Sequence, residues 1–211
     1  MKNNKGNFRP GYKVVKRIFD IVAAIFAIIL TSPLMLLAVV LIVTDPKAKG
    51  GIIFKQNRFG KDGKLFKILK FRTMQKDAPN EMPTGDFGDM EKYFTRSGKF
   101  LRKTSIDELP QLFNVLRGDM SIVGPRPLIR TETEIHKLRK KYGIYSVLPG
   151  VTGWAQVNGR DMVGAVEKAE YDCEYLRRMS FWFDIKIVFM TVGLVVSGSG
   201  IEDGASKKHT H

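Results

Sequence analysis

The sequence predicts a mainly helical fold with a little β-structure, in which one apolar segment enters a membrane and returns on the same face. Three observations predict it. A charge-free apolar run at residues 21–43 contains Ser32 and Pro33 near its middle. Basic residues flank this run on both sides. Four later stretches carry helical periodicity, whereas only residues 52–72 show the alternation that is typical of strands.

The chain of 211 residues is long enough for one domain with a hydrophobic core. We predict a single domain over residues 1–211, with a re-entrant membrane helix at 21–43 and a compact cytoplasmic part at 45–200. Lys plus Arg outnumber Asp plus Glu by 35 to 21, which favours anionic partners such as nucleic acid, lipid headgroups or phosphorylated substrates. One cysteine and three histidines make a disulfide or a zinc site unexpected. The glycine patterns of P-loop and dinucleotide-binding proteins do not occur.

The apolar run could cross a bilayer core as a straight helix, at about 1.5 Å per residue. Its flanks argue against a crossing. Six cations and no acid precede Asp20, and nine cations accompany two acids over residues 45–72. Segments that hold many cations stay on the cytoplasmic side of a membrane. A crossing would place one flank outside, whereas a segment that returns on the same face keeps both flanks inside.

The middle of the apolar run offers a means of turning. Pro33 has no N–H and collides with the carbonyl four residues earlier, so we expect a break at Ser32 and Pro33 between two short helices. The hydroxyls of Thr31 and Ser32 can donate to the carbonyls that the break frees. The alternative is an ordinary transmembrane helix that tolerates a proline.

The rest of the chain combines one hairpin with several helices. Residues 52–72 predict two short strands joined by a turn at Gly60–Gly63. Residues 75–91 are rich in proline, glycine and acid, and predict an exposed loop. A capping-box pattern, Thr131 with Glu134, opens one predicted helix. Helical patterns occur at about 92–103, 107–117, 131–142 and 164–179.

Residues 181–196 form the last apolar stretch. It begins with three aromatic residues and runs apolar after Lys186, but it is too short to span a bilayer. This composition suits an amphipathic helix that lies in the membrane interface. The alternative is a buried core helix.

Two adjacent acids, Asp107 and Glu108, open one of the predicted helices. Pro110 marks the helix start, because proline is tolerated in the first turn. Free N–H groups and the positive end of the helix dipole stabilise ionised carboxylates there. The pair could provide a nucleophile or hold a cation. The alternative is simple capping, because Ser105 and Glu108 have the spacing of a capping box.

Two later segments contain residues that fix the backbone. Arg126 lies between two prolines, so its guanidinium loses less entropy on binding a phosphate through paired N–H donors. A stiff surface loop is the alternative. Residues 149–160 combine glycines with a tryptophan, an asparagine and an arginine, and suit either a binding loop or a tight structural corner.

Together these segments resemble the bacterial sugar transferase family, the monotopic polyprenyl-phosphate phosphoglycosyl transferases. The resemblance runs from about Lys13 to Gly200 and is closest to the short form of the family, which lacks an additional amino-terminal transmembrane bundle. It rests on these motifs: Lys16-Arg-Ile-Phe-Asp20, Ser32-Pro33, Lys70-Phe-Arg-Thr-Met74, Ser105-Ile-Asp-Glu-Leu-Pro110, Gly124-Pro-Arg-Pro127 and Pro149-Gly-Val-Thr-Gly153.

The resemblance implies an enzyme at the cytoplasmic face of a bacterial plasma membrane. Such an enzyme transfers a sugar 1-phosphate from a UDP-sugar to undecaprenyl phosphate and releases UMP, as the first membrane step of exopolysaccharide, capsule or glycoconjugate synthesis. The resemblance implies Asp107 as a covalent nucleophile and Glu108 as a ligand of Mg²⁺, which is commonly held by one or two carboxylates and substrate phosphates. Arg126 is the implied phosphate clamp, and Arg102 a second phosphate-binding cation. Ser32-Pro33 is the implied helix break.

Two alternatives belong to other classes. A basic membrane-anchored scaffold or nucleic-acid-binding protein would explain the charge, but would not require an acidic pair, so we expect no nucleic-acid partner. A phosphatase that works through an aspartyl-phosphate would release free sugar phosphate. The sequence contains no recognisable hexose-specificity signature and leaves open whether the protein forms a homo-oligomer.

Overall fold

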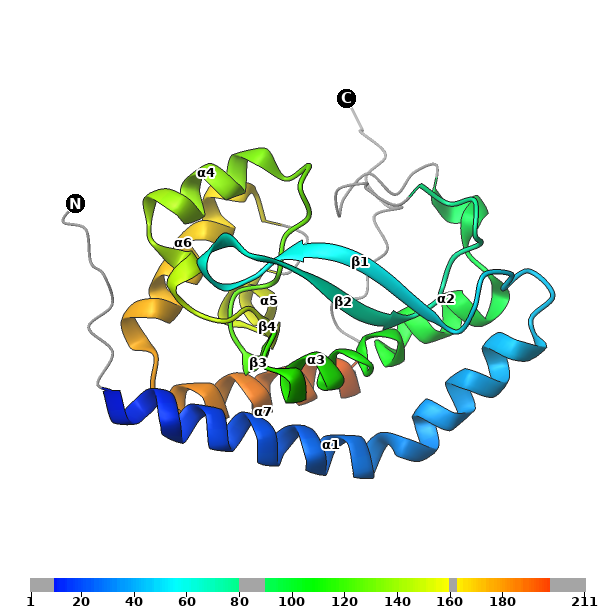
Figure 1. The fold of residues 1–211 in the computed structure, drawn as a ribbon, viewed down its shortest axis with the longest axis horizontal. Coiled ribbons are helices and arrows are strands. Elements are labelled where there is room, and N and C mark those ends of the chain that lie inside the picture. Colours follow the sequence, from blue (N-terminus) through cyan, green and yellow to red (C-terminus); the bar gives the residue numbers. More distant parts are fainter. Residues whose placement is uncertain (1–9, 80–89, 160–162, 198–211) are drawn as a thin grey trace.

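The structure is a computed structural model that describes residues 10–79, 90–159 and 163–197 (Figure 1). It is mainly helical with two small sheets, as predicted. Its α-helices are α1 (Pro10–Thr44), α2 (Arg96–Lys103), α3 (Gln111–Arg117), α4 (Thr133–Lys141), α5 (Trp154–Asn158), α6 (Ala165–Arg178) and α7 (Phe181–Ser197). The strands are β1 (Ile53–Phe59), β2 (Leu65–Phe71), β3 (Ser121–Val123) and β4 (Gly150–Thr152), and short 3-10 turns occupy Lys61–Gly63, Met90–Tyr93, Ile106–Glu108 and Ile144–Ser146.

Helix α1 is continuous and bends near its middle (Figure 1). The predicted pair of separate short helices is therefore wrong, although the predicted kink is present. Pro33 has no N–H to donate to the carbonyl of Ile29, and the Ser32 hydroxyl donates to that carbonyl instead, at 2.8 Å. The Thr31 hydroxyl donates to the carbonyl of Ala27 at 2.7 Å. Ser32 therefore fills the role that the sequence predicted for it, whereas Thr31 donates to a carbonyl that Pro33 does not free.

Both ends of the apolar run are attached to the same folded body. Near the first end, the Asp20 carboxylate accepts hydrogen bonds from the Ser121 hydroxyl at 2.9 Å and from the Ile122 N–H at 3.0 Å. Near the second end, the Asp45 carboxylate accepts from the N–H and the hydroxyl of Ser97, both at 2.9 Å. The helix therefore lies across the body along much of its length, as Figure 1 shows.

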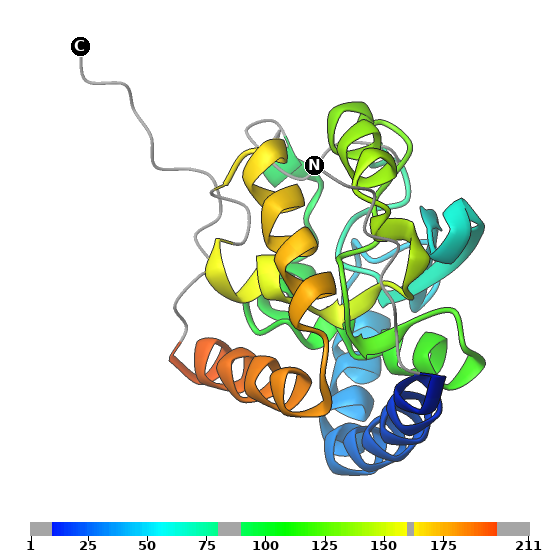
Figure 2. The ribbon, with the colours of Figure 1, turned by 90° about the vertical axis from the view of Figure 1, so that its left-hand side faces the viewer.

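A buried carboxylate joins α7 to the beginning of α1. Asp184 is 1% exposed and accepts hydrogen bonds from Lys16 Nζ at 2.7 Å, Tyr175 Oη at 2.8 Å and Tyr12 Oη at 3.0 Å. The two helices consequently share one side of the molecule (Figure 2).

Helix α7 has both of the features between which the sequence did not decide, an exposed apolar face and a face buried in the core. Its inner face is buried in the core through Phe183 and Ile187, whereas Trp182 is 77% exposed and Phe189 is 72% exposed. An exposed apolar face beside α1 suits a helix that lies in a membrane interface.

Small residues of α1 allow the rest of the chain to pack closely against it. Ala24 is buried with Leu112 and Val115 of α3, and Ala38 is buried with Leu101 of α2. A third cluster consists of Val123, Trp154, Tyr175, Phe183 and Ile187.

The predicted hairpin is confirmed, and α3 is attached to it. Strands β1 and β2 are antiparallel and are joined by a turn at Lys61–Gly63. The side chain of Asn114, fully buried on α3, donates to the Lys67 carbonyl at 2.8 Å and accepts from the Leu69 N–H at 2.9 Å. This pair of hydrogen bonds fixes α3 along β2.

The predicted helices are present with different boundaries. Helices α2, α4 and α6 lie within the predicted ranges, but α4 begins at Thr133 after the capping position Glu132. The capping box of Thr131 and Glu134 is therefore wrong, and Glu132 instead accepts from the N–H of Ile129 at 2.8 Å. Most of the predicted 75–91 loop, residues 80–89, lies outside the described residues.

We predict that Asp184→Asn lowers the free energy of unfolding by about 3–5 kcal/mol, because it leaves the largely buried Lys16 ammonium without its closest carboxylate. Thermal unfolding in detergent measures the loss. Asp62→Asn, at an exposed turn position, is the control and should change stability by less than about 0.5 kcal/mol. Equal melting temperatures for all three proteins would contradict the role given to Asp184.

Candidate active site

The two acids lie in the 3-10 turn Ile106–Glu108, directly ahead of α3 rather than in its first turn. Asp107 is 5% exposed. Ser105 adopts a left-handed backbone with φ of 57° and makes no capping hydrogen bond with its side chain. The capping-box alternative for Ser105 and Glu108 is therefore wrong, and the acids are available for another role.

Glu108 contacts two cations from distant parts of the chain. Lys70 Nζ, on β2, lies 2.7 Å from Glu108 Oε1. Arg126 Nη1, in the loop after β3, lies 3.5 Å from the same oxygen. The Lys70 and Glu108 side chains are 15% and 23% exposed, so this cluster is shielded from most of the solvent. The structure thus brings the predicted Glu108 and Arg126 together.

Burial and the surrounding cations act differently on the two carboxylates. Burial raises the pKa of Asp107 above its usual range, and Lys70 opposes this shift only in part. Burial also acts to raise the pKa of Glu108, but Lys70 and Arg126 outweigh it and hold that pKa below its usual range. Glu108 is therefore a stable anion held by cations, whereas the charge of Asp107 is poorly compensated.

Arg102, the other predicted phosphate-binding cation, belongs to the same region. It lies on α2, with its guanidinium carbon 5.4 Å from the centre of the Phe94 ring. Its charge acts to lower the pKa of both Asp107 and Glu108. Cations from three separate segments therefore surround the two acids.

Sequence reasoning missed Lys70 and Arg58 as site residues. Strand alternation could have indicated Lys70, because it falls on the same face of β2 as the buried Ile68, where a charged residue needs a partner. Arg58 lies on β1, with a side chain only 12% exposed. Burial lowers the pKa of Arg58 to about 10, and the positive charge of Arg126 adds to the shift.

The segment that begins at Pro149 forms a tight structural corner. Gly150 N donates to the Pro125 carbonyl at 3.0 Å, and Gly124 N donates to the Thr152 carbonyl at 2.9 Å. A Cβ at Gly150 would lie 2.1 Å from the nitrogen of Gly124, so only glycine allows this approach. These contacts support the predicted structural corner at residues 150–152, and the predicted use as a binding loop stays a prediction. The last residue of the segment, Arg160, lies outside the described residues.

The helix-break residues are separate from the acidic pair. Ser32 and Pro33 are exposed on α1, and neither is among the described residues that contact Glu108. They therefore contribute to the shape of α1 and not to the cluster around the acids.

The donor set limits which metal the site could hold. Within the described residues, no group of three or more His, Cys, Asp or Glu side chains could enclose a metal ion. The site offers two adjacent carboxylates, and both Lys70 and Arg126 approach Glu108 at Oε1. This set fits Mg²⁺, which accepts one or two carboxylates when phosphate oxygens and waters complete its shell.

Comparison with known proteins identifies one matching family and several similar proteins. A family described as "Bacterial sugar transferase" matches residues 11–198. A Bacillus subtilis protein named "Uncharacterized sugar transferase EpsL" is 41% identical over 189 residues, which is 90% of this chain and 91% of that protein.

Two longer relatives carry more specific names. The "UDP-N-acetylgalactosamine-undecaprenyl-phosphate N-acetylgalactosaminephosphotransferase" of Aeromonas hydrophila is 42% identical over 94% of this chain and 48% of its own length. The "UDP-glucose:undecaprenyl-phosphate glucose-1-phosphate transferase" of Escherichia coli is 43% identical over 85% of this chain and 40% of its own. This chain therefore spans less than half the length of these two relatives.

We predict that Lys70→Met lowers the free energy of unfolding on the order of 2–3 kcal/mol, because it leaves a buried carboxylate pair without its closest cation. The same substitution in a Glu108→Gln background should cost at least about 1 kcal/mol less, and thermal unfolding in detergent measures this coupling. Lys67→Met, at an exposed position of the same strand, is the control. Additive effects of Lys70→Met and Glu108→Gln would show that the pair does not stabilise the site.

Proposed function

The chain belongs to the bacterial sugar transferase family, and on that premise we propose that it transfers a sugar 1-phosphate from a UDP-sugar to a polyprenyl phosphate and releases UMP. The names of the Aeromonas hydrophila and Escherichia coli relatives describe this kind of reaction. The observation that carries the proposal is the buried Asp107 beside a Glu108 that Lys70 and Arg126 hold. The product would begin the membrane stage of exopolysaccharide, capsule or glycoconjugate synthesis.

The reaction proceeds in two displacements at one phosphorus atom. In the first, a carboxylate oxygen of Asp107 bonds to the sugar-bearing phosphorus, and the bond from that phosphorus to the UMP oxygen breaks. In the second, a phosphate oxygen of the polyprenyl phosphate bonds to the same phosphorus, and the bond to Asp107 breaks. The second step restores the carboxylate and yields a polyprenyl diphosphate sugar, so the two steps balance.

The surroundings of the two acids support different roles for them. Glu108 has its Oε1 committed to Lys70 and Arg126, which lowers its tendency to form a new bond. Asp107 is buried, and its charge is poorly compensated, so bond formation to phosphorus relieves an unfavourable charge. Lys70, Arg102 and Arg126 offset the charge that develops as one phosphate bond replaces another. Asp107 is therefore the nucleophile of the proposal.

Glu108 would hold Mg²⁺, with Asp107 adjacent and phosphate oxygens of the substrate completing the shell. Bound there, the ion would neutralise charge on the diphosphate and lower its repulsion of the attacking carboxylate. The lysine and arginine side chains supply the fixed positive charge of the site whether or not the metal is present.

The attachment of α1 supports a monotopic placement at the cytoplasmic face of the plasma membrane. Among the described residues, one helix, Gly11–Thr44, is long and apolar enough to cross a bilayer. A helix that crossed would have one end across the bilayer from the polar body, yet Asp20 and Asp45 near its two ends both bond to that body. The bent helix would instead enter one leaflet and return, with side chains such as Ile29, 68% exposed, facing lipid.

We predict that both flanks of the apolar run are on the cytoplasmic side. Asn3→Cys and Ala205→Cys, each in a Cys173→Ser background, should resist a membrane-impermeant thiol reagent in intact cells and react after lysis. Replacing both Ser32 and Pro33 by Leu should straighten α1 and expose one site. External labelling of either cysteine with Ser32 and Pro33 intact would exclude the re-entrant placement.

We predict that Arg126→Lys lowers turnover by about 30- to 150-fold, equivalent to about 2–3 kcal/mol, although it keeps the charge. A lysine is a point cation and cannot bind a phosphate through two parallel N–H donors. The assay is UMP release in the presence of carrier lipid, and Arg130→Lys, at an exposed position four residues later, is the control. A near-native rate for Arg126→Lys would assign Arg126 to the stiff-loop alternative.

We predict that incubation with a UDP-sugar and Mg²⁺, without carrier lipid, yields at most one equivalent of UMP and an adduct of sugar-phosphate mass on the Asp107 peptide. A panel of UDP-hexoses and UDP-N-acetylhexosamines identifies the donor. Asp107→Asn should abolish the adduct and glycolipid formation, because the amide lacks the anionic oxygen. Glu108→Gln should slow the reaction and weaken its Mg²⁺ dependence.

Three outcomes distinguish the alternatives. A scaffold would release no UMP with any donor, and a phosphatase would give free sugar phosphate instead of glycolipid. Glycolipid made by Asp107→Asn would exclude the covalent route and favour direct attack by the lipid phosphate.

A further inference from the structure

The loop that carries Arg126 is held by donors from outside itself. Its two prolines have no N–H groups, so they cannot donate the hydrogen bonds that usually fix a turn. Donors from three other segments hold three consecutive carbonyls: Gly150 N holds that of Pro125 at 3.0 Å, Arg139 Nη1 that of Arg126 at 2.6 Å, and Arg58 Nη1 that of Pro127 at 3.2 Å.

The donor to Arg126 is itself fixed by a buried ion pair. Arg139 lies on α4, and its Nε and Nη2 lie 2.9 Å and 2.6 Å from Oδ2 of Asp172 on α6. The two side chains are 4% and 2% exposed. The guanidinium thus uses one edge for the carboxylate and its remaining nitrogen, Nη1, for the Arg126 carbonyl.

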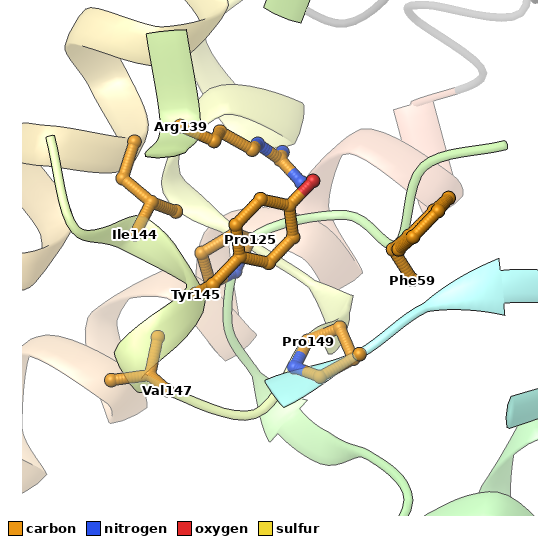
Figure 3. Close-up of a pocket in the computed structure, with 8 residues that line it drawn as sticks. Phe59, Pro125, Arg139, Ile144, Tyr145, Val147 and Pro149 are labelled. Atoms are coloured by element: carbon orange, nitrogen blue, oxygen red, sulfur yellow. The ribbon is translucent and has the colours of Figure 1, made fainter. Parts of the chain in front are cut away.

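Side-chain packing leaves a small space beside this loop. A small pocket lies beside Pro125 and is also lined by Phe59, Tyr145, Pro149 and Arg139 (Figure 3). Arg139 therefore lines this space as well as reaching the loop, and its hydrogen bond is the contact that holds the Arg126 carbonyl itself.

Stability alone does not account for the buried pair. Replacing a buried ion pair by apolar residues of similar volume is often neutral or stabilising, because burying two charges costs about as much as their attraction returns. An apolar pair would fill the same space between α4 and α6, but it could not donate to the Arg126 carbonyl. That donation is the contribution which only the ion pair supplies.

We propose that Arg139, held by Asp172, is a positioning residue that fixes the backbone of Arg126 so that its guanidinium faces Glu108 and the substrate phosphate. Arg139 acts through Arg126 and does not itself contact the substrate. The inference rests on the proposed function, because it assigns Arg139 to the phosphate clamp of that reaction.

The test is a double replacement, Arg139→Met with Asp172→Leu, combined with Arg126→Ala in a mutant cycle. UMP release is measured under single-turnover conditions, with thermal unfolding in parallel. The double replacement should keep the melting temperature within a few degrees and lower the rate at least tenfold. In the Arg126→Ala background it should lower the rate further by less than twofold, because the side chain that Arg139 positions is already absent.

The matched control is Lys140→Met with Glu170→Leu, which makes the same kinds of change at exposed positions of α4 and α6 and should leave the rate unchanged. A rate loss of equal size in both Arg126 backgrounds, or no loss at all, overturns the proposal. If the double replacement unfolds the protein, Arg139→Lys, which keeps the charge but not the three-nitrogen geometry, is carried through the same cycle. An unmodified protein that releases no UMP contradicts the proposed function, whereas an active one with additive losses contradicts this inference alone.

Discussion

The contact between Lys70 and Glu108 is the interaction on which the site depends. It joins two positions 38 residues apart, and Arg126 adds a third segment 18 residues further along the chain. Two adjacent carboxylates could not both remain charged in a largely buried turn without such cations. The attachment of α3 to β2 through Asn114 matters for the same reason, because it holds the acidic turn at the strand that carries Lys70.

Much of the fold was predictable because it follows from local chemistry. The turn at Gly60–Gly63, the helix at residues 164–179 and the bend near the middle of α1 each follow from residue types close together in the sequence, and the structure confirms them (Figure 1). The presence of Glu108 and Arg126 in one site was predicted from the family resemblance, which rests on the order and content of several motifs. Both flanks of the apolar run are attached to one body, whereas their placement on the cytoplasmic side, drawn from their charges, stays a prediction.

The sequence predictions that were wrong, and the site residues that were missed, lie where residues distant in the sequence determine the local structure. Ser105 has the spacing of a cap but adopts a left-handed conformation, and the Glu108 side chain pairs with Lys70 of another strand instead of taking part in a cap. Nothing in the sequence near Arg58 or Arg139 indicates that their side chains reach the carbonyls of Pro127 and Arg126. Strand alternation alone could indicate that Lys70 faces inward, and it does not identify the partner.

The bend of α1 has a consequence for the order in which the protein is assembled. The Ser32 hydroxyl donates to the carbonyl of Ile29, three residues earlier, so the carbonyl that the proline leaves without its helical N–H finds a donor within the same turn of helix. The bend therefore needs no donor from another part of the chain to satisfy this carbonyl. In the proposed re-entrant placement, the bent helix would be able to enter the bilayer before the later residues fold, and Asp20 and Asp45 would then be the points to which the body attaches.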